Sequence, residues 1–217
     1  MKRRVAILIS GRGSNMAALI RAAATQHFPA EIALVISNRA DAAGLEKAQA
    51  SSVPTLTIES AAFGKDRAAF EALVQSALLE HGIDLICLAG FMRLLTADFV
   101  QRWYGRMLNI HPSLLPSFPG IDPARQALRA GVKISGATVH FVIPETDAGP
   151  ILMQGAVPVR DDDTTDALAA RILAIEHRIY PDALRLVASG AVWLDGATCK
   201  VRGSVGCGGT LISPAVT

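Results

Sequence analysis

Asn109 and His111 stand two positions apart in the segment Asn109-Ile110-His111-Pro112-Ser113-Leu114-Leu115-Pro116, directly after a short apolar run. If residues 107–110 form a strand, alternate side chains point the same way, so the amide and the imidazole reach one side of the sheet. Two such donors can polarise a carbonyl oxygen and stabilise the oxyanion that forms when an amine attacks it. The pair alone also fits a histidine that caps a loop and an asparagine that holds a turn.

A carboxylate that could complete this chemistry is Asp147, in the Gly- and Pro-containing segment 144–150. Placed beside His111, it would favour the protonated imidazole or take a proton through a water molecule. A carboxylate in such a loop also serves simply as a turn former. The sequence has no Gly-x-Ser-x-Gly motif and no cysteine with a plausible histidine partner. The pattern therefore favours direct attack by a substrate amine, without a covalent enzyme intermediate.

A glycine-containing turn, Gly11-Arg12-Gly13-Ser14-Asn15, follows the first apolar run of the chain. Glycines let the backbone approach a ligand, and a helix that starts here would offer its N–H groups to a phosphate. The alternative is an ordinary tight turn between a strand and a helix. The segment lacks the lysine of a Walker A loop and the third glycine of a dinucleotide fingerprint. It is therefore interpreted as a site for a monophosphate.

The first 60 residues alternate strand and helix signals. A continuous apolar run predicts a buried strand at 5–9, and 32–36 and 54–58 are interpreted as a second and a third strand. Helical spacing predicts a helix over 16–23, capped by Ser14 or Asn15, and a second helix near 42–50. A β-α-β-α-β succession of this kind is typical of a parallel sheet with crossover helices.

The remaining segments continue the same pattern. Thr96 is expected to cap one helix and Asp122 another that ends near Gly131, and Pro181 should kink or interrupt a long helix from about residue 164. The further strands are expected at 83–88, 107–110, 138–143 and 151–159. The fold class predicted is α/β and Rossmann-like, a mostly parallel central sheet with helices on both faces.

Composition agrees with a single catalytic domain over residues 1–195, followed by a hairpin and a partly disordered tail over 196–217. The chain has 217 residues, of which 51% are hydrophobic and 18% charged, enough for one packed core. A net charge of +2 indicates neither nucleic acid nor membrane as partner, and no run approaches the roughly 20 apolar residues of a membrane span. Cys87, Cys199 and Cys207 lack disulfide or metal spacing, which favours the reducing cytoplasm.

Six segments occur in the order found in one enzyme family. Together they resemble the phosphoribosylglycinamide formyltransferases (glycinamide ribonucleotide transformylases) of purine synthesis, and the likeness runs from about Val5 to Val192. The Asn-x-His-Pro-Ser-Leu-Leu-Pro segment is typical of folate-dependent formyl transfer in general, and Gly-x-Gly-Ser-Asn narrows the likeness to this member. The six are Gly11-Arg12-Gly13-Ser14-Asn15, Ala89-Gly90-Phe91-Met92-Arg93, Asn109 to Pro116, Thr138-Val139-His140-Phe141-Val142, Asp147-Ala148-Gly149-Pro150-Ile151 and Glu176-His177-Arg178-Ile179-Tyr180-Pro181.

The resemblance implies an enzyme that moves the formyl group of 10-formyltetrahydrofolate, a cosubstrate, to the amine of glycinamide ribonucleotide, without a metal. Asn109, His111 and Asp147 match the family's catalytic residues. The residues that match its phosphate and ribose contacts are Gly11, Arg12, Gly13, Ser14, Asn15, Arg67 and Glu176. Those that match its folate cleft are Arg93, Leu94, Leu95, Val100, His140, Val142 and Ile143. Taken singly, the leucines and Val100 would be core residues, and the charged ones surface residues.

One position departs from the family pattern. Ile121-Asp122 follows Pro119-Gly120, whereas many members have a histidine two residues after this Pro-Gly pair.

Three alternatives remain open: a formyltetrahydrofolate hydrolase, a non-catalytic nucleotide-binding module and a Rossmann oxidoreductase. A hydrolase typically adds an N-terminal domain. An oxidoreductase would need an acidic residue where Ser37-Asn38-Arg39 stands. The chain also looks too short for a methionyl-tRNA formyltransferase, and it is expected to be a monomer or a homodimer that binds small molecules only.

Overall fold

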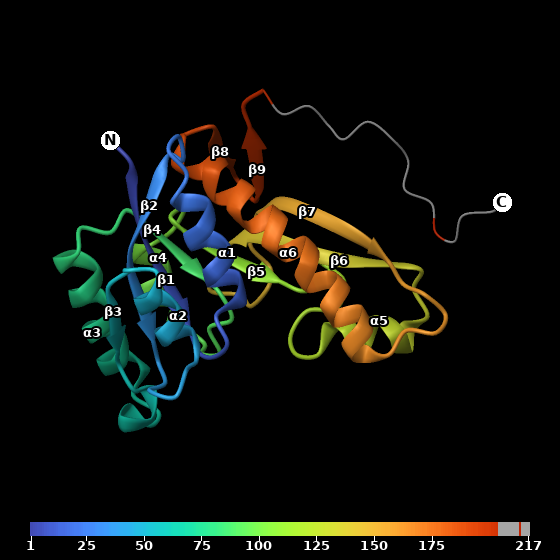
Figure 1. Ribbon diagram of the computed structural model, residues 1–217, viewed down its shortest axis with the longest axis horizontal. Coiled ribbons are helices and arrows are strands. Elements are labelled where there is room, and N and C mark those ends of the chain that lie inside the picture. Colours follow the sequence, from blue (N-terminus) through green and yellow to red (C-terminus); the bar gives the residue numbers. More distant parts are fainter. Residues whose placement is uncertain (204–212, 214–217) are drawn as a thin grey trace.

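The computed structural model describes residues 1–203 and residue 213. Its main element is a seven-stranded sheet with the order β3-β2-β1-β4-β5-β6-β7, shown in Figure 1. Neighbouring strands from β3 to β5 are parallel, and the last two pairs are antiparallel. The strands are β1 (Arg3–Ile9), β2 (Ala30–Ser37), β3 (Thr55–Thr57), β4 (Leu85–Leu88), β5 (Met107–His111), β6 (Ile134–Phe141) and β7 (Ile151–Pro158). The predicted fold class is confirmed.

Both faces of the sheet are buried along its central strands β1, β2 and β4, which explains the continuous apolar runs in the sequence. Along β1, the side chains of Val5, Ile7 and Ile9 belong to one apolar cluster and those of Ala6 and Leu8 to another. This alternation follows from the two-residue period of a strand. A helical layer must therefore cover each face.

The helices divide between these two clusters. Helices α1, α2, α5 and α6 supply buried residues to the first cluster, and α3 and α4 supply them to the second. In Figure 1, α1 and α6 lie side by side in front of the sheet. The helices are α1 (Ser14–Ala23), α2 (Gly44–Ala50), α3 (Arg67–Glu80), α4 (Ala97–Arg102), α5 (Pro123–Ala130) and α6 (Thr165–Ala188), with one 3-10 turn at Ser60–Phe63.

The antiparallel pair β6–β7 packs closely against α6. A Cβ atom on Gly155 would lie 2.4 Å from Cγ1 of Ile175, so only glycine lets the helix approach this strand. Strand β6 begins four residues before the predicted start of 138, because alternation alone does not mark where a strand enters the sheet. The other six strands of the sheet overlap their predicted ranges.

The predictions for the N-terminal caps of the helices are partly right and partly wrong. Thr96 and Thr164 cap α4 and α6 through their hydroxyl groups, the first as predicted. The predicted side-chain caps at Ser14, Asn15 and Asp122 are wrong. Helix α1 instead follows Gly13 in the left-handed conformation, with no side-chain cap bond. Asp122 precedes α5 with φ at 55°, which turns its carboxylate away from the helix N–H groups and toward Arg125, 3.3 Å away.

Pro181 lies inside α6 without ending it, so the predicted interruption is wrong. Strands β8 (Val192–Asp195) and β9 (Thr198–Val201) form the predicted antiparallel hairpin. The predicted domain boundary at residue 195 falls at the end of β8 and stays a prediction. Most of the predicted disordered tail, with Cys207, lies outside the described residues. Within residues 1–203 and 213, no helix is both long enough and apolar enough to cross a membrane.

Candidate active site

Strand β5 ends with Asn109 and His111, and both side chains reach one polar cluster, as alternation predicts. Nδ2 of Asn109 lies 3.1 Å from Nε2 of His140 on the neighbouring strand β6. Nδ1 of His140 lies 2.9 Å from the carbonyl oxygen of Phe141, which can only accept, so Nδ1 carries the proton. The neutral ring then accepts from the Asn109 amide at Nε2. Burial lowers the pKa of His140, which favours this neutral form.

His111 is held at both ring nitrogens and is only 6% exposed. Nε2 lies 3.0 Å from the carbonyl oxygen of Phe118 and donates to it. Nδ1 faces Oδ1 of Asp147 at 3.4 Å, the distance of an ion pair rather than a close hydrogen bond. A proton on Nδ1 as well would give an imidazolium that both acceptors stabilise.

Asp147 is oriented by its backbone and by the loop that follows His111. Its φ is 55°, and its other carboxylate oxygen accepts a 2.8 Å hydrogen bond from the N–H of Gly120. Phe118 and Asp122 also have positive φ values. Non-glycine residues in this conformation cost free energy and gather at functional sites. The two loops thus face each other across the imidazole of His111.

A second layer of hydrogen bonds holds the segment after His111. The hydroxyl group of Thr138 on β6 donates to the Ser113 carbonyl at 2.7 Å and accepts from the Leu115 N–H at 3.0 Å. Gln154 on β7 donates to the Leu115 carbonyl and to the same hydroxyl. The residues that follow β5 are therefore fixed to β6 and β7, which limits the movement of His111.

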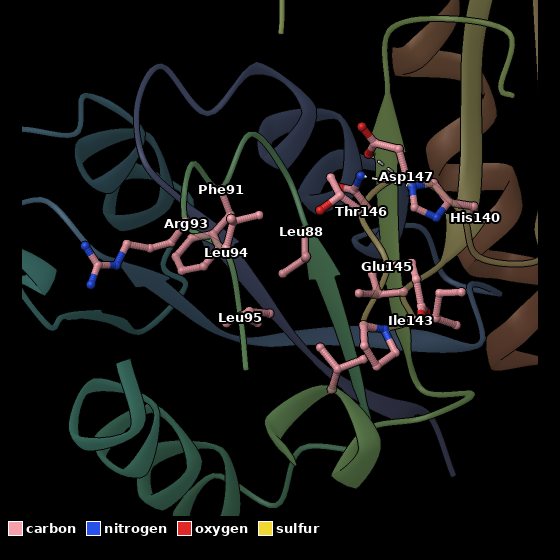
Figure 2. Close-up of a pocket in the computed structure, with 14 residues that line it drawn as sticks. Leu88, Phe91, Arg93, Leu94, Leu95, His140, Ile143, Glu145, Thr146 and Asp147 are labelled. Atoms are coloured by element: carbon pink, nitrogen blue, oxygen red, sulfur yellow. Dashed lines mark hydrogen bonds and ion pairs between the residues drawn. The ribbon is translucent and has the colours of Figure 1, made fainter. Parts of the chain in front are cut away.

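A first cleft opens beside this cluster, and we call it the folate cleft after its predicted ligand. Figure 2 shows His140 and Asp147 at one end of the lining and Arg93 at the opposite side, with apolar side chains between them. All seven residues predicted to contact folate line it, together with Asn109 and Asp147. The seven are Arg93, Leu94, Leu95, Val100, His140, Val142 and Ile143.

A second cleft of about 700 Å³ lies at the start of α1, and we call it the phosphate cleft. It is lined by the phosphate loop, which we define as Gly11–Asn15, and by Glu176 of α6. Nδ2 of Asn15 donates to Oε2 of Glu176 at 2.6 Å, and burial raises the pKa of Glu176. Oδ1 of Asn15 is buried and has no hydrogen-bond partner among the described residues. Asn15 and Glu176 therefore form one polar unit in the wall of this cleft.

The two clefts meet at the ends of β4 and β5. Between residues 88 and 93, Leu88, Phe91 and Arg93 line the folate cleft, whereas the residues between them line the phosphate cleft. Asn109 lines the first cleft and Pro112 the second, and His111 lies between them in the chain but lines neither. The hydroxyl group of Tyr180 lies 3.0 Å from the Leu88 carbonyl and 3.1 Å from the Leu108 carbonyl, which joins the two strands just before the site.

Arg67 is predicted to contact the substrate, but the structure places it away from both clefts. It is exposed at the first position of α3 and lines neither cleft. Sequence reasoning missed Phe91, Glu145 and Thr146, which line the folate cleft. Aromatic and loop residues of this kind carry no chemical signature. It also missed the acceptor of His111, because a backbone carbonyl has no sequence signal.

One observation limits the chemistry that the site can perform. Burial raises the pKa of the Cys87 thiol to about 12, so this residue is no thiolate nucleophile at neutral pH. Among residues 1–203 and 213, no group of three or more His, Cys, Asp or Glu side chains is arranged to hold a metal ion. The arrangement suits attack on a carbonyl carbon by a substrate nucleophile, with His111 and Asn109 as donors.

Comparison with known proteins supports the same interpretation of the site. The profile of the formyl transferase family matches residues 3–184, most of the chain. The chain belongs to the formyl transferase family. The predicted likeness to folate-dependent formyltransferases is thereby confirmed.

Individual formyl transferases share most of this sequence. Phosphoribosylglycinamide formyltransferase of Escherichia coli (strain K12) is 41% identical over 206 residues, which are 92% of this chain and 97% of that protein. The trifunctional purine biosynthetic protein adenosine-3 of Bos taurus is 51% identical over 202 residues, 92% of this chain. The chain spans only 20% of that longer relative.

Solved formyl transferase structures superpose closely on this fold. Glycinamide ribonucleotide transformylase 1 from Symbiobacterium toebii has a TM-score of 0.89 at 46% identity, over 93% of this chain and 94% of that one. A formyltetrahydrofolate deformylase from Pseudomonas syringae has a TM-score of 0.87 at 28% identity, over 93% of this chain and 66% of that one. The fold is thus shared by transferases and by a deformylase, so the site must separate the two reactions.

Proposed function

We propose that this chain transfers the formyl group of 10-formyltetrahydrofolate to the amine of glycinamide ribonucleotide, a step of purine synthesis. The observation that carries the proposal is that two clefts approach each other at the end of β5. Asn109 lines the folate cleft there, and His111, which is buried and lines neither cleft, lies 3.4 Å from Asp147. A transferase must bring two substrates to one pair of donors, and this geometry supplies a cleft for each. The likeness to proteins named for this reaction supports it over most of the chain.

In the proposed reaction, Nδ1 of His111 is the nitrogen that acts on the formyl oxygen. Nε2 is already occupied by the Phe118 carbonyl, so Nδ1 is the position left to a ligand. The 3.4 Å separation from Asp147 leaves the Nδ1 proton available to a third group. As the substrate amine attacks, the formyl oxygen gains negative charge, and the imidazolium stabilises it.

Asn109 supplies the second donor. One of its two amide hydrogens is directed to Nε2 of His140, and the other remains for the formyl oxygen. His140 therefore has a role in addition to the folate contact that the resemblance implies. It sets which end of the Asn109 amide points at the reacting carbon.

The reaction also requires one proton to change place. The amine nitrogen forms a bond to the formyl carbon, the bond from that carbon to N10 of the folate breaks, and the amine's proton passes to N10. We assign Asp147 to this transfer, directly or through water, because its carboxylate lies beside His111 and lines the folate cleft.

The substrates are assigned to the clefts by chemistry. The phosphate meets the N-terminus of α1 at the phosphate loop, and the ribose hydroxyls meet Glu176 and the unpaired oxygen of Asn15. The pterin end of the folate meets Val100, Val142 and Ile143, while Arg93 suits a folate carboxylate. A role for Arg67 in binding stays a prediction, as do the cytoplasmic location and the choice between monomer and homodimer.

The second candidate is hydrolysis of the same folate, because a deformylase shares this fold, although its identity of 28% is below the 46% of the transformylase structure. The test is a spectroscopic assay of folate deformylation by the purified protein, with and without glycinamide ribonucleotide. The proposal predicts consumption of 10-formyltetrahydrofolate only when the ribonucleotide is present. Consumption without it would support the hydrolase, and no consumption in either tube would contradict both.

A further inference from the structure

The carbonyl groups of the phosphate loop are bound by α2, a helix that lines neither cleft. The carbonyl oxygen of Gly11 accepts a 3.0 Å hydrogen bond from the N–H of Gly44. The carbonyl oxygen of Arg12 accepts a 2.6 Å hydrogen bond from the ammonium group of Lys47. Both donors belong to α2, with Gly44 at its first position and Lys47 in its last turn. Two successive peptide groups are thus held from the side of α2.

We propose that Gly44 and Lys47 are positioning residues that set the phosphate loop in its binding conformation. A trans peptide places its C=O and N–H on opposite sides of the chain. When α2 holds the carbonyls of Gly11 and Arg12, the N–H groups of Arg12 and Gly13 point the other way. Within residues 1–203 and 213, neither of these N–H groups donates to a protein group. They are therefore available to an anion.

Electrostatics explains why the orientation of these peptide groups matters for phosphate binding. A carbonyl oxygen turned toward the cleft would repel a phosphate, whereas an N–H group attracts it. The glycines of the loop allow either orientation, because a glycine backbone has few steric limits. Without an outside constraint, the loop would sample both, and the phosphate would have to order it on binding. Binding by α2 supplies this constraint before the substrate arrives.

The close approach of α2 depends on glycine. A Cβ atom on Gly44 would lie 2.6 Å from Cδ1 of Ile9 and 3.0 Å from the Gly11 carbonyl oxygen. A Cβ atom on Gly13, which has φ at 66°, would lie 2.8 Å from Cα of Gly44. The two backbones are therefore in direct contact. Any larger residue at position 44 would push the helix away from the loop.

Lys47 adds a charge to this contact. It is exposed, so its ammonium group is well solvated, but it still donates to a backbone carbonyl in a charge-assisted hydrogen bond. That bond polarises the Arg12 peptide and strengthens the partial positive charge on the N–H of Gly13. The lysine thus supports phosphate binding through the peptide.

The inference rests on the proposed function for the identity of the phosphorylated substrate, and the experiment separates the two. The variants are Lys47→Met, Lys47→Arg and, as a control for loss of one exposed lysine, Lys133→Met just before β6. In Lys47→Met we expect the KM for glycinamide ribonucleotide to rise about ten-fold, the value of one charge-assisted hydrogen bond. The kcat and the KM for the folate should stay within about two-fold, and Lys47→Arg should restore most of the loss.

A direct readout of the loop needs no substrate. The amide resonances of Arg12 and Gly13 should shift in the ligand-free Lys47→Met protein and stay unchanged in Lys133→Met. Calorimetry with ribose 5-phosphate should show weaker binding to Lys47→Met by about the same factor. If the wild type binds ribose 5-phosphate but transfers no formyl group, the proposed function fails while the role of α2 is still tested by this binding.

Three outcomes would overturn the role of α2. An unchanged KM and unchanged amide resonances in Lys47→Met would show that the lysine does not act on the loop. An equal loss for both substrates would indicate a general structural defect. A raised KM for glycinamide ribonucleotide with unmoved amide resonances in Lys47→Met would make the lysine a direct ligand of the phosphate. In that case Gly44→Ala, which removes no charge, would leave the KM unchanged.

Discussion

The phosphate cleft and the folate cleft are built in different ways. In the phosphate cleft, the proposed binding element is one continuous segment, the phosphate loop with the start of α1. It is held by α2, and residues after β4, of β5 and of α6, among them Glu176, complete the wall. The folate cleft uses side chains from the segment that follows β4, from α4, from β5, and from β6 with the loop after it, which the sheet brings together. A change in the first should remain local, whereas a change in the second should reach the catalytic residues.

The largest expected effect is that of His111→Ala. The substitution removes the donor at Nδ1, and kcat should fall by about 1,000-fold, within the range for one positioned acid or oxyanion donor. The KM for each substrate should change little, because neither cleft loses a binding group. Steady-state kinetics with both substrates varied would measure this. A kcat within ten-fold of the wild type would remove His111 from the mechanism.

A pair of glycine substitutions tests the difference between the clefts directly. A Cβ atom on Gly149 would lie 1.8 Å from the Phe141 carbonyl oxygen, whereas one on Gly11 would meet nothing within 4 Å. Gly149→Ala should lower the free energy of unfolding by about 1–3 kcal/mol and lower kcat as well, because it displaces the end of β6 next to His140. Gly11→Ala should leave stability within about 0.5 kcal/mol.

Urea unfolding and kinetics of the two proteins provide the measurement. Equal stability losses would mean that the two loops are constrained alike. That result would contradict the contrast between the clefts.

Glu176→Gln should raise stability and weaken substrate binding at the same time. Burial raises the pKa of Glu176 above its ordinary value of 4.5, so the folded state resists its ionisation. The wild type therefore loses stability as the pH rises from 4.5 through the higher pKa of the folded state, and the glutamine variant does not. The KM for glycinamide ribonucleotide should rise about ten-fold, because ionised acceptors bind hydroxyls more strongly.

Thermal unfolding of Glu176→Gln between pH 4 and 8, together with kinetics at pH 7, would check both parts. A stability difference that stays constant across this range would exclude the ionisation argument. An unchanged KM would remove Glu176 from the ribose site.

The smallest effect is expected outside both clefts, at Asp163. Its carboxylate forms two hydrogen bonds with Arg171, at 2.7 and 2.8 Å, and this pairing lowers the pKa of Asp163 to about 2. The pair therefore contributes its full stability above pH 3.8, and the contribution is lost as the pH falls toward 2. Asp163→Asn should cost about 1 kcal/mol at pH 7 and change no kinetic constant.

Comparison of urea unfolding at pH 7 and pH 3 would test this, since the cost should shrink at the lower pH. A change in either KM would show that the start of α6 is coupled to the clefts. In that case Asp163 could not serve as a reference for the other variants.

The part of the site that the sequence predicted best is local. Asn109 and His111 are two residues apart in a strand, and the phosphate loop is one turn, so spacing alone places each group. The side-chain caps predicted for α1 and α5 are wrong because cap preferences assume ordinary backbone angles, whereas Gly13 and Asp122 are left-handed. Positive φ values at these positions depend on the surrounding loops.

The sequence by itself determined the fold class, the two motifs and the family, because periodicity and contiguous motifs are properties of neighbouring residues. Only the tertiary structure decided that His140 holds Asn109, that the Phe118 carbonyl occupies Nε2 of His111, and that Arg67 lies apart from both clefts. The first of these contacts joins residues that are distant in the chain, and the second uses a backbone group that every residue possesses. Such contacts exist only after the sheet brings its strands together.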